Sequence, residues 1–292
     1  PHNVRIFHTE NTLGSALEIE NYVDMTGITK DTDIFMRLDT SIDNSKYLYT
    51  DSNGYQMVRR QRQNSFPVSG NVYPISDACY IQDKTTRLSL LAGQPHGVAS
   101  LQKGQLDVFL DRKIFHDDGK GLGEGAKDNV QTVSKFFLLL ERPKDNILDE
   151  QEVNRLSYQS LVSQSLLNHL LHPVVDFIAD KPQRIVNPIF APLETLLPCD
   201  VDLVNFKTME PVSRASPKET VMILRRRVFQ CSFSVYDLNW GTCCTEIQLD
   251  MYFQNLRPAN LHTIRTVSLP DSDRILFHTR SLLKKLFGPT LE

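Results

Sequence analysis

Residues 47–59 read YLYTDSNGYQMVR, and this stretch decides the fold class. The runs 47–50 and 55–59 have strand character, and turn-forming residues separate them. Asn53 and Gly54 both tolerate the positive backbone φ that a tight hairpin turn requires. The stretch therefore predicts a β-hairpin whose turn lies at these two residues.

Strand-like runs of the same kind continue on both sides of this hairpin. The further candidates are 33–40, 78–81, 87–92, 105–110 and 134–140. Turn-rich residues separate them at short spacing, which is typical of an antiparallel sandwich and not of alternating βα units. We therefore expect a mainly β fold built on one large antiparallel β-sandwich.

The rest of the chain predicts a division into three parts. We expect a main β-sandwich domain at 1–142, a helical and Pro-rich crossing segment at 143–220, and a second, smaller β unit with a short terminal helix at 221–292. Within the crossing, apolar residues recur at helical spacing over residues 157–171, and Pro173 follows. This pattern predicts one helix there.

The composition is that of a folded globular protein. The chain has 292 residues, of which 40% are hydrophobic and 23% charged, close to the average of soluble domains. The formal net charge of −3 argues against a nucleic-acid-binding protein, because such proteins carry a clear basic excess. No apolar run approaches the length of about 20 residues that spans a bilayer.

The N-terminus lacks the features of a natural start. It has no initiator Met, no charged n-region and no apolar segment, and strand-like residues begin at Val4. We therefore expect the chain to be a portion of a longer polypeptide, so that the missing signal peptide says nothing about its compartment.

Cysteine and histidine spacing offers no metal motif. There are 5 cysteines, and none belongs to a Cys-x-x-Cys pair. Cys231 could pair with Cys243 or Cys244 in an oxidising compartment, and buried free thiols are the alternative. His169 and His172 are spaced so that they could share a metal, but nothing nearby resembles a third ligand. We expect no metal site in this chain.

Glycine and charge are densest at residues 110–125, LDRKIFHDDGKGLGEG. Glycines at alternate positions disfavour a regular helix or strand, because glycine loses the most backbone entropy there. A loop on a rigid β scaffold is a common place for a functional site, and a purely structural turn is the alternative. His116 in this segment is a candidate general base or an ordinary exposed histidine.

Three well-known kinds of site do not fit this segment. The Gly-x-Gly-x-x-Ala run at 121–126 has dinucleotide-binding spacing, but no βαβ pattern surrounds it. A phosphate-binding P-loop needs Ser or Thr after its Lys, and Gly121 follows Lys120. Asp117 and Asp118 do not supply the two opposed carboxylates of a glycosidase, because adjacent side chains diverge.

An ordered series of motifs across residues 14–142 resembles glycoside hydrolase family 38, the class II α-mannosidases. The motifs are MRLDTSI at 36–42, YTDSNGYQ at 49–56, RLSLLAGQPHGVASL at 87–101, GQLDVFLDR at 104–112 and DDGKGLGEG at 117–125. The Leu-Gly-x-Gly continuation and KDN at 127–129 are similar to the Golgi branch of the family. Residues 143–292 match weakly, mainly in position.

The resemblance implies the C-terminal part of a retaining Golgi α-mannosidase that trims α-1,3- and α-1,6-linked mannose from N-glycan intermediates. Its implied partners are the N-glycan and an upstream catalytic domain of the same polypeptide, with membrane attachment only through an N-terminal anchor. The family binds zinc through two His and two Asp and uses another Asp as nucleophile, all in that upstream domain. No catalytic residue and no zinc ligand is therefore assignable in this chain.

The resemblance also implies that this portion is a β supersandwich that sends a loop to the active-site rim. In the family the basic residue of that loop is usually Arg and lies near the sugar site, whereas here it is Lys120. Lysine keeps the charge but loses the planar, multi-donor fork of arginine. We expect Lys120 to supply positive charge near the substrate or the catalytic carboxylates, with Asp117 and Asp118 shaping the loop.

Two other interpretations stay open. A lysosomal α-mannosidase would have an acidic pH optimum and would cleave small oligomannosides broadly. A non-catalytic β-sandwich module would bind glycans as this chain alone, without metal. A catalytically inactive homologue of the family also stays open, and Lys120 in place of the family's usual Arg slightly favours it.

Overall fold

The computed structural model describes residues 1–117, 119–121, 123–143, 158–175, 200–209, 219–230, 233, 264–269 and 272–277. The chain divides into two compact units. The first contains Pro1–Asp176 and Gln230–Tyr236, and the second contains Phe177–Phe229 and Asp237–Glu292. In the described residues no helix is long and apolar enough to cross a membrane.

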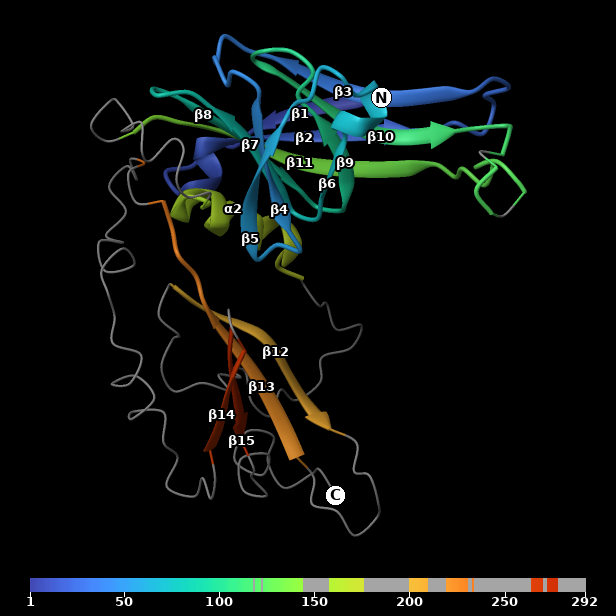
Figure 1. Ribbon diagram of the computed structural model, residues 1–292. Coiled ribbons are helices and arrows are strands. Elements are labelled where there is room, and N and C mark those ends of the chain that lie inside the picture. Colours follow the sequence, from blue (N-terminus) through green and yellow to red (C-terminus); the bar gives the residue numbers. More distant parts are fainter. Residues whose placement is uncertain are drawn as a thin grey trace, which may run out of the picture. The chain divides into compact units, whose positions relative to one another are not determined.

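Two antiparallel sheets form most of the first unit (Figure 1). The strands are β1 His2–Ile6, β2 Ala16–Val23, β3 Thr32–Asp39, β4 Tyr47–Ser52, β5 Gln56–Gln61, β6 Tyr73–Ile75, β7 Ala78–Gln82, β8 Arg87–Ala92, β9 His96–Ala99, β10 Gln105–Lys113 and β11 Thr132–Glu141. The larger sheet has the order β1-β2-β11-β8-β7-β4-β5 and the smaller has β3-β10-β9-β6. Two short 3-10 helices, η1 Thr12–Ser15 and η2 Val68–Asn71, precede β2 and β6. The expected antiparallel sandwich is confirmed.

The main core lies between the two sheets. Its fully buried members come from both sheets and include Ile81 and Leu90 from the larger and Val98 and Val108 from the smaller. Successive side chains of a strand point to opposite faces of its sheet, so each strand of the larger sheet also presents a second set of side chains away from this core. On β8 every residue is buried, which requires a cover on that outer face as well.

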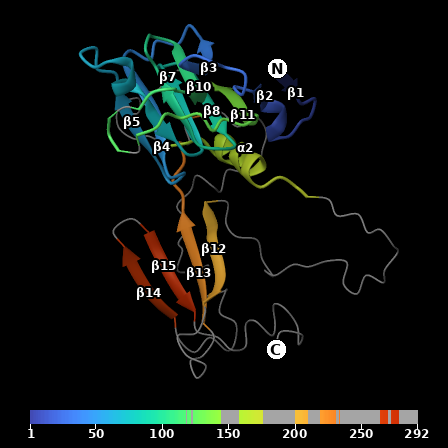
Figure 2. The ribbon, with the colours of Figure 1, turned by 90° about the vertical axis from the view of Figure 1, so that its right-hand side faces the viewer.

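Helix α2, Leu161–Leu171, supplies this cover (Figure 2). Leu166 and Leu167 are 0% and 1% exposed and pack with Leu91 and Phe137 of the larger sheet. Each such leucine contributes about 2 kcal/mol through the apolar surface that it removes from water. The first unit therefore has three layers, namely the smaller sheet, the larger sheet and a helix.

The helix begins later than the sequence pattern predicts. Ser160 has extended backbone, with φ −73° and ψ 161°, and its side chain accepts a hydrogen bond from the backbone N–H of Ser163. A serine in this position satisfies one of the unpaired N–H groups at a helix start and so fixes the first turn. The predicted start at 157 lies outside the described residues, and the predicted end at Leu171 is confirmed.

The predicted hairpin joins β4 to β5, with Asn53 at φ 53° and Gly54 at φ 70°. Asp51 ties this turn to the neighbouring strand. Its Oδ2 accepts from the N–H of Gly54 at 2.7 Å, and its Oδ1 accepts from the N–H groups of Ser76, Asp77 and Ala78 at 2.8, 3.1 and 3.1 Å. The turn is thus held by a buried carboxylate as well as by its own backbone.

The second unit contains one antiparallel sheet with the strands β12 Val201–Met209, β13 Glu219–Arg226, β14 Ile264–Leu269 and β15 Ser272–Phe277. Their order is β12-β13-β15-β14. β12 lies in the segment 143–220, for which we expected a helix and loops but no strand. The domain boundaries at 142 and 220 stay a prediction, and the expected terminal helix lies outside the described residues.

The described residues include one cysteine. Cys79 is free and fully buried in the core between the sheets, where burial raises the pKa of its thiol. It therefore behaves as a small apolar side chain. Cys231, Cys243 and Cys244, for which we left a disulfide open, lie outside the described residues.

Candidate functional site

The glycine-rich segment forms the loop between β10 and β11, residues 114–131, which we call the β10–β11 loop. β10 belongs to the smaller sheet and β11 to the larger, so the loop passes from one sheet to the other at one end of the sandwich (Figure 1). Its two arms are therefore anchored in different sheets.

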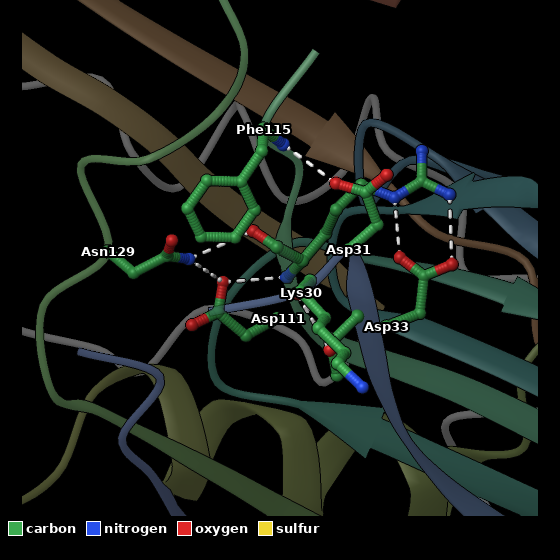
Figure 3. Close-up of polar contacts among 8 residues, drawn as sticks. Lys30, Asp31, Asp33, Asp111, Phe115 and Asn129 are labelled. Carbon is green, nitrogen blue, oxygen red and sulfur yellow. Dashed lines mark hydrogen bonds and ion pairs between the residues drawn. The ribbon is translucent and has the colours of Figure 1, made fainter. Parts of the chain in front are cut away.

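A β-bulge interrupts β10 shortly before the first arm of the loop begins. The pairing register of β10 with β3 shifts between Phe109 and Asp111, which leaves Leu110 as the extra residue. Beyond the bulge, Asp111 Oδ1 accepts hydrogen bonds from the backbone N–H of Arg112 at 2.7 Å and from Asn129 Nδ2 at 2.9 Å (Figure 3). Asn129 Nδ2 also donates to the carbonyl of Arg112 at 2.9 Å. Asn129 thereby ties the second arm of the loop to the end of β10.

A buried lysine fixes the end of β10 from another direction. Lys113 is 7% exposed, and its Nζ donates to the carbonyl oxygens of Met25 and Thr26 at 2.9 and 3.1 Å. A buried ammonium is costly unless its donors find partners, so these two carbonyls make the position of Lys113 specific. The loop thus starts from a strand end that is held on the turn before β3.

The next residues of the loop contact Asp31, which lies just before β3. Asp31 Oδ1 accepts from the backbone N–H of Phe115 at 2.8 Å, and its Oδ2 lies 2.8 Å from Nδ1 of His116 (Figure 3 shows the first contact). The Phe115 ring has the ammonium of Lys113 at 5.7 Å and that of Lys127 at 5.9 Å from its centroid. Phe115 therefore connects both arms of the loop to Asp31.

Close backbone approach brings the two arms together. The N–H of Ile114 donates to the carbonyl of Ala126 at 2.9 Å. A Cβ added to Gly125 would lie 2.2 Å from the carbonyl oxygen of Ile114, so only glycine fits at this crossing. The contacts of Asp31, Lys113, Gly125 and Asn129 together define what we call the base of the loop.

The tip of the loop carries the residues that the sequence singled out. Asp117 Oδ2 accepts from the N–H of Gly119 at 2.8 Å, and Gly119 and Gly123 have positive φ of 72° and 74°. Lys120 is exposed at this tip, close along the chain to Asp117. Asp118 lies outside the described residues. The structure therefore places Lys120 next in the chain to a glycine that Asp117 holds, and the role of both residues in binding stays a proposal.

This arrangement has a limited set of chemical uses. An ammonium donates hydrogen bonds and has no acceptor, so Lys120 suits a hydroxyl, carboxylate or other electron-rich group. The described residues contain no group of three or more His, Cys, Asp or Glu side chains that could hold a metal ion. They therefore do not fit a zinc centre, and His169 and His172 are both exposed at the end of α2.

Two surface depressions of the first unit lie away from this loop. Two depressions of ≈ 470 and ≈ 500 Å³ lie around residues 43–47, and no residue of the β10–β11 loop lines either. The loop is a projection from the sandwich, and a site that used it would need a surface opposite to it.

Sequence reasoning found the tip but missed most of the base. Asp31 gave no local signal, because its partners Phe115 and His116 are distant in sequence and only the β3–β10 pairing brings them close. Asn129 did have a signal, since the KDN run at 127–129 belongs to the family resemblance. Its role as a tie to Asp111 required the structure.

Comparison with protein families identifies the sandwich as a glycoside hydrolase domain. Residues 3–120 match the model described as the glycosyl hydrolases family 38 C-terminal domain. Residues 3–120 therefore form a domain of this family, and the resemblance indicated by the sequence motifs is confirmed.

Individual relatives carry the name Alpha-mannosidase 2. The protein of Rattus norvegicus is 37% identical over 80% of this chain and 21% of its own length. That of Homo sapiens is 35% identical over 95% of this chain and 24% of its own, and that of Arabidopsis thaliana is 36% identical over 78% and 20%. The chain thus spans between 20% and 24% of the length of these three relatives.

Proposed function

We propose that this chain is the C-terminal part of a retaining α-mannosidase that trims α-1,3- and α-1,6-linked mannose from N-glycan intermediates in the Golgi lumen. In this role the sandwich supports an upstream catalytic domain of the same polypeptide, and the β10–β11 loop contributes to the rim of the active site. The protein is anchored in the membrane through a segment outside this chain.

One observation carries the proposal. Similarity to the human Alpha-mannosidase 2 extends over 95% of this chain at 35% identity, so it includes most of the family 38 domain match at residues 3–120. An alignment of this extent includes the second unit as well as the sandwich. It supports a shared role for the whole chain and not only a shared sheet topology.

The proposed role of the loop rests on its construction. The contacts of the base join the loop to β10 and to the segment before β3. At the tip, Asp117 accepts a hydrogen bond from Gly119 within the loop itself. A positive charge presented from a fixed base does not have to be reorganised when substrate binds, which is what electrostatic stabilisation of a reacting group requires. We assign this role to Lys120, with Asp117 and Asp118 shaping the turn around it.

Zinc belongs to the proposal as a cofactor of the upstream domain. It would supply Lewis-acid chemistry and orient the sugar there. The described residues of this chain offer no fitting ligand set, so we assign them no step that involves the metal. Their part is to support the catalytic domain and to place positive charge at its rim.

The first experiment compares this chain with the same gene product extended upstream. Hydrolysis of an aryl α-mannoside is measured for both, with and without a zinc chelator. We expect activity only from the extended chain and its loss with chelator. Activity of this chain alone would overturn the placement of the catalytic groups upstream. Inactivity of both would favour a non-catalytic glycan-binding module, which metal-free glycan binding by this chain would then identify.

The choice between Golgi and lysosomal types needs a different substrate pair. A GlcNAc-bearing N-glycan intermediate and a small oligomannoside are compared across pH. Preference for the GlcNAc-bearing glycan supports the Golgi assignment, and broad cleavage of oligomannosides with an acidic optimum supports the lysosomal one.

Substitution of Lys120 in the extended chain tests the loop itself. Lys120→Ala is expected to lower kcat/KM by about 10-fold or more, because a charge at the reacting group is lost, while Tm changes little. Lys103→Ala is the matched control, since Lys103 is also exposed, forms a surface pair with Asp43 at 2.8 Å and precedes the opposite end of β10. Unchanged kcat and KM for Lys120→Ala would contradict the proposal that Lys120 of this loop acts at the rim of the active site.

A further inference from the structure

Two aspartates near the start of β3 contact the end of β10 in different ways. Asp33 and Arg112 are cross-strand partners within the ladder, and they form a bidentate pair with distances of 2.6 and 3.0 Å. Asp31 lies one residue before the last ladder pair, Thr32 with Lys113. Its contacts with Phe115 and His116 therefore lie beyond the end of the backbone pairing.

The backbone pairing of β10 with β3 ends at Lys113 and Thr32, and beyond it the side chain of Asp31 supplies the hydrogen-bond acceptor. After Lys113 the chain turns away from β3, and the N–H of Phe115 has the carboxylate of Asp31 as its acceptor at 2.8 Å. The second carboxylate oxygen takes Nδ1 of the following residue, His116, at 2.8 Å. One side chain thus contacts two successive loop residues, Phe115 (Figure 3) and His116, at the point where the first arm leaves the sandwich.

Phe115, which Asp31 holds, contacts a lysine from each arm of the loop. Its ring lies near the ammonium groups of Lys113 and Lys127, one on each arm. A hydrogen bond between the arms, from Ile114 to Ala126 at 2.9 Å, closes the base at the same level. Lys120 lies at the tip of the loop, between the two arms that the base holds together.

We infer that Asp31 is a positioning residue, which fixes where Lys120 is presented to an α-mannoside by holding Phe115 and His116 at the base of the β10–β11 loop. The inference rests on the proposed function, because it assigns to Asp31 an effect on turnover. It adds a residue that lies far from the loop in sequence and whose described contacts are with Phe115 and His116 at the base of the loop.

Because Asp31 and His116 are exposed, replacing Asp31 should affect the position of the loop more than the stability of the fold. The side chains of Asp31 and His116 are 48% and 70% exposed, and polar contacts between exposed side chains contribute little to folding stability. Loss of the carboxylate therefore changes the free energy of unfolding little. The same loss frees the amide of Phe115 and the first arm, and a displacement of about 1 Å of a group at the reacting centre can lower turnover about 100-fold.

The test uses the full-length polypeptide with its catalytic domain. Asp31→Ala is compared with Asp31→Asn, whose amide oxygen can still accept from Phe115, and with Asp33→Ala as the matched control, an aspartate two residues further on that contacts Arg112 of β10 within the ladder. We expect kcat/KM for an aryl α-mannoside to fall about 10-fold in Asp31→Ala, to recover partly in Asp31→Asn, and to stay unchanged in Asp33→Ala. Equal losses in Asp31→Ala and Asp33→Ala would overturn the inference, because they would indicate a general effect on the strand pair.

A double substitution asks whether Asp31 acts through the tip. If it does, Asp31→Ala lowers kcat/KM much less in a Lys120→Ala background than in the wild type, because the group that it positions is already absent. Fully additive losses would contradict this mechanism and leave Asp31 with an independent role.

Hydrogen exchange separates failure of the inference from failure of the proposed function. We expect the amide of Phe115 to exchange faster in Asp31→Ala than in wild type or Asp33→Ala, while the amides of β8 stay protected. Unchanged exchange at Phe115 would overturn the anchoring whatever the activity. A wild-type protein without mannosidase activity would instead refute the proposed function, and the exchange result would still decide whether Asp31 holds the loop.

Discussion

Glu141 and Arg87 are cross-strand partners at the ends of β11 and β8, and both side chains are buried. The guanidinium of Arg87 donates to Gln82 Oε1 from Nε at 2.9 Å and from Nη2 at 2.7 Å, and to the carbonyl of Tyr158 from Nη1 at 3.0 Å. Neither carboxylate oxygen of Glu141 has a well-aligned hydrogen-bond partner among the described residues, although the hydroxyls of Ser160 and Ser89 lie near enough to favour its charged form slightly. The arginine is therefore satisfied by other groups, and the glutamate is the less well satisfied member of the pair.

This relationship predicts that Glu141→Gln stabilises the fold at neutral and alkaline pH. Burial raises the pKa of Glu141, and the nearby charge of Arg87 only partly offsets that effect. A raised pKa means that the contribution of Glu141 to stability is complete below the ordinary glutamate pKa and is lost as pH rises through the raised value. Thermal unfolding is measured at about pH 4.5, 6 and 8, which spans this window. We expect the advantage of Glu141→Gln to grow with pH, and a variant that is clearly less stable at pH 8 would contradict the assignment.

Asp51→Asn is expected to destabilise the sandwich by about 3 kcal/mol, because a buried acceptor is replaced by a donor that faces other donors. The carboxylate is 3% exposed and accepts four backbone N–H groups from the hairpin turn and the start of β7. Chemical denaturation provides the measurement. Asp43→Asn is the control, since its carboxylate is 61% exposed and pairs with Lys103, and its loss should cost far less than that of Asp51 because solvent screens an exposed pair. Similar losses in the two variants would show that the buried network adds nothing.

His96 predicts a pH dependence of the opposite sign. Burial lowers the pKa of its imidazole, while Nδ1 donates to the carbonyl of Phe109 at 2.9 Å and Nε2 is buried without a partner among the described residues. A lowered pKa means that stability is complete above the ordinary histidine pKa and is lost as pH falls toward the folded value. His96→Asn, which keeps a donor toward Phe109, should flatten the decline of Tm between about pH 7 and 5. An unchanged slope would place the responsible group elsewhere.

Gly125→Ala is expected to disturb the base of the loop, whereas Gly121→Ala is expected to be tolerated. A Cβ at Gly125 would lie 2.2 Å from the carbonyl oxygen of Ile114, and one at Gly121 would meet nothing within 4 Å. The backbone shift forced by the first substitution should cost on the order of 1–3 kcal/mol. Amide exchange of Ile114 and the free energy of unfolding measure the effect. Equal behaviour of the two variants would mean that the arms do not depend on this approach.

Local signals in the sequence predicted several elements because the information lies within each of them. The strand at Arg87–Ala92 is a run of apolar residues between turns, and the structure has it with the same bounds. The turn at Asn53 and Gly54 follows from the conformations that these residues tolerate. β10 continues to Lys113, beyond the predicted end at 110, because contacts with β3 and with the carbonyls of Met25 and Thr26 extend it.

Long-range pairing was beyond the sequence. β11 lies between β2 and β8, and no local feature of Thr132–Glu141 selects those partners. The same limit applies to the candidate site, where glycines and charges marked the tip with Lys120. Asp31 and the buried position of Lys113 depend on which strands become neighbours, so they emerged only from the fold.

The division of the β10–β11 loop into a held base and an exposed tip has a consequence for protein engineering. A combinatorial library that varies positions 117, 120 and 121 would change the chemistry presented by the loop without altering the contacts that carry it. Variation at Asp31, Gly125 or Asn129 would instead break contacts of the base, and most variants in such a library would then have a displaced loop. Under the proposed function, the tip is thus the part of the loop whose chemistry can be varied separately from folding.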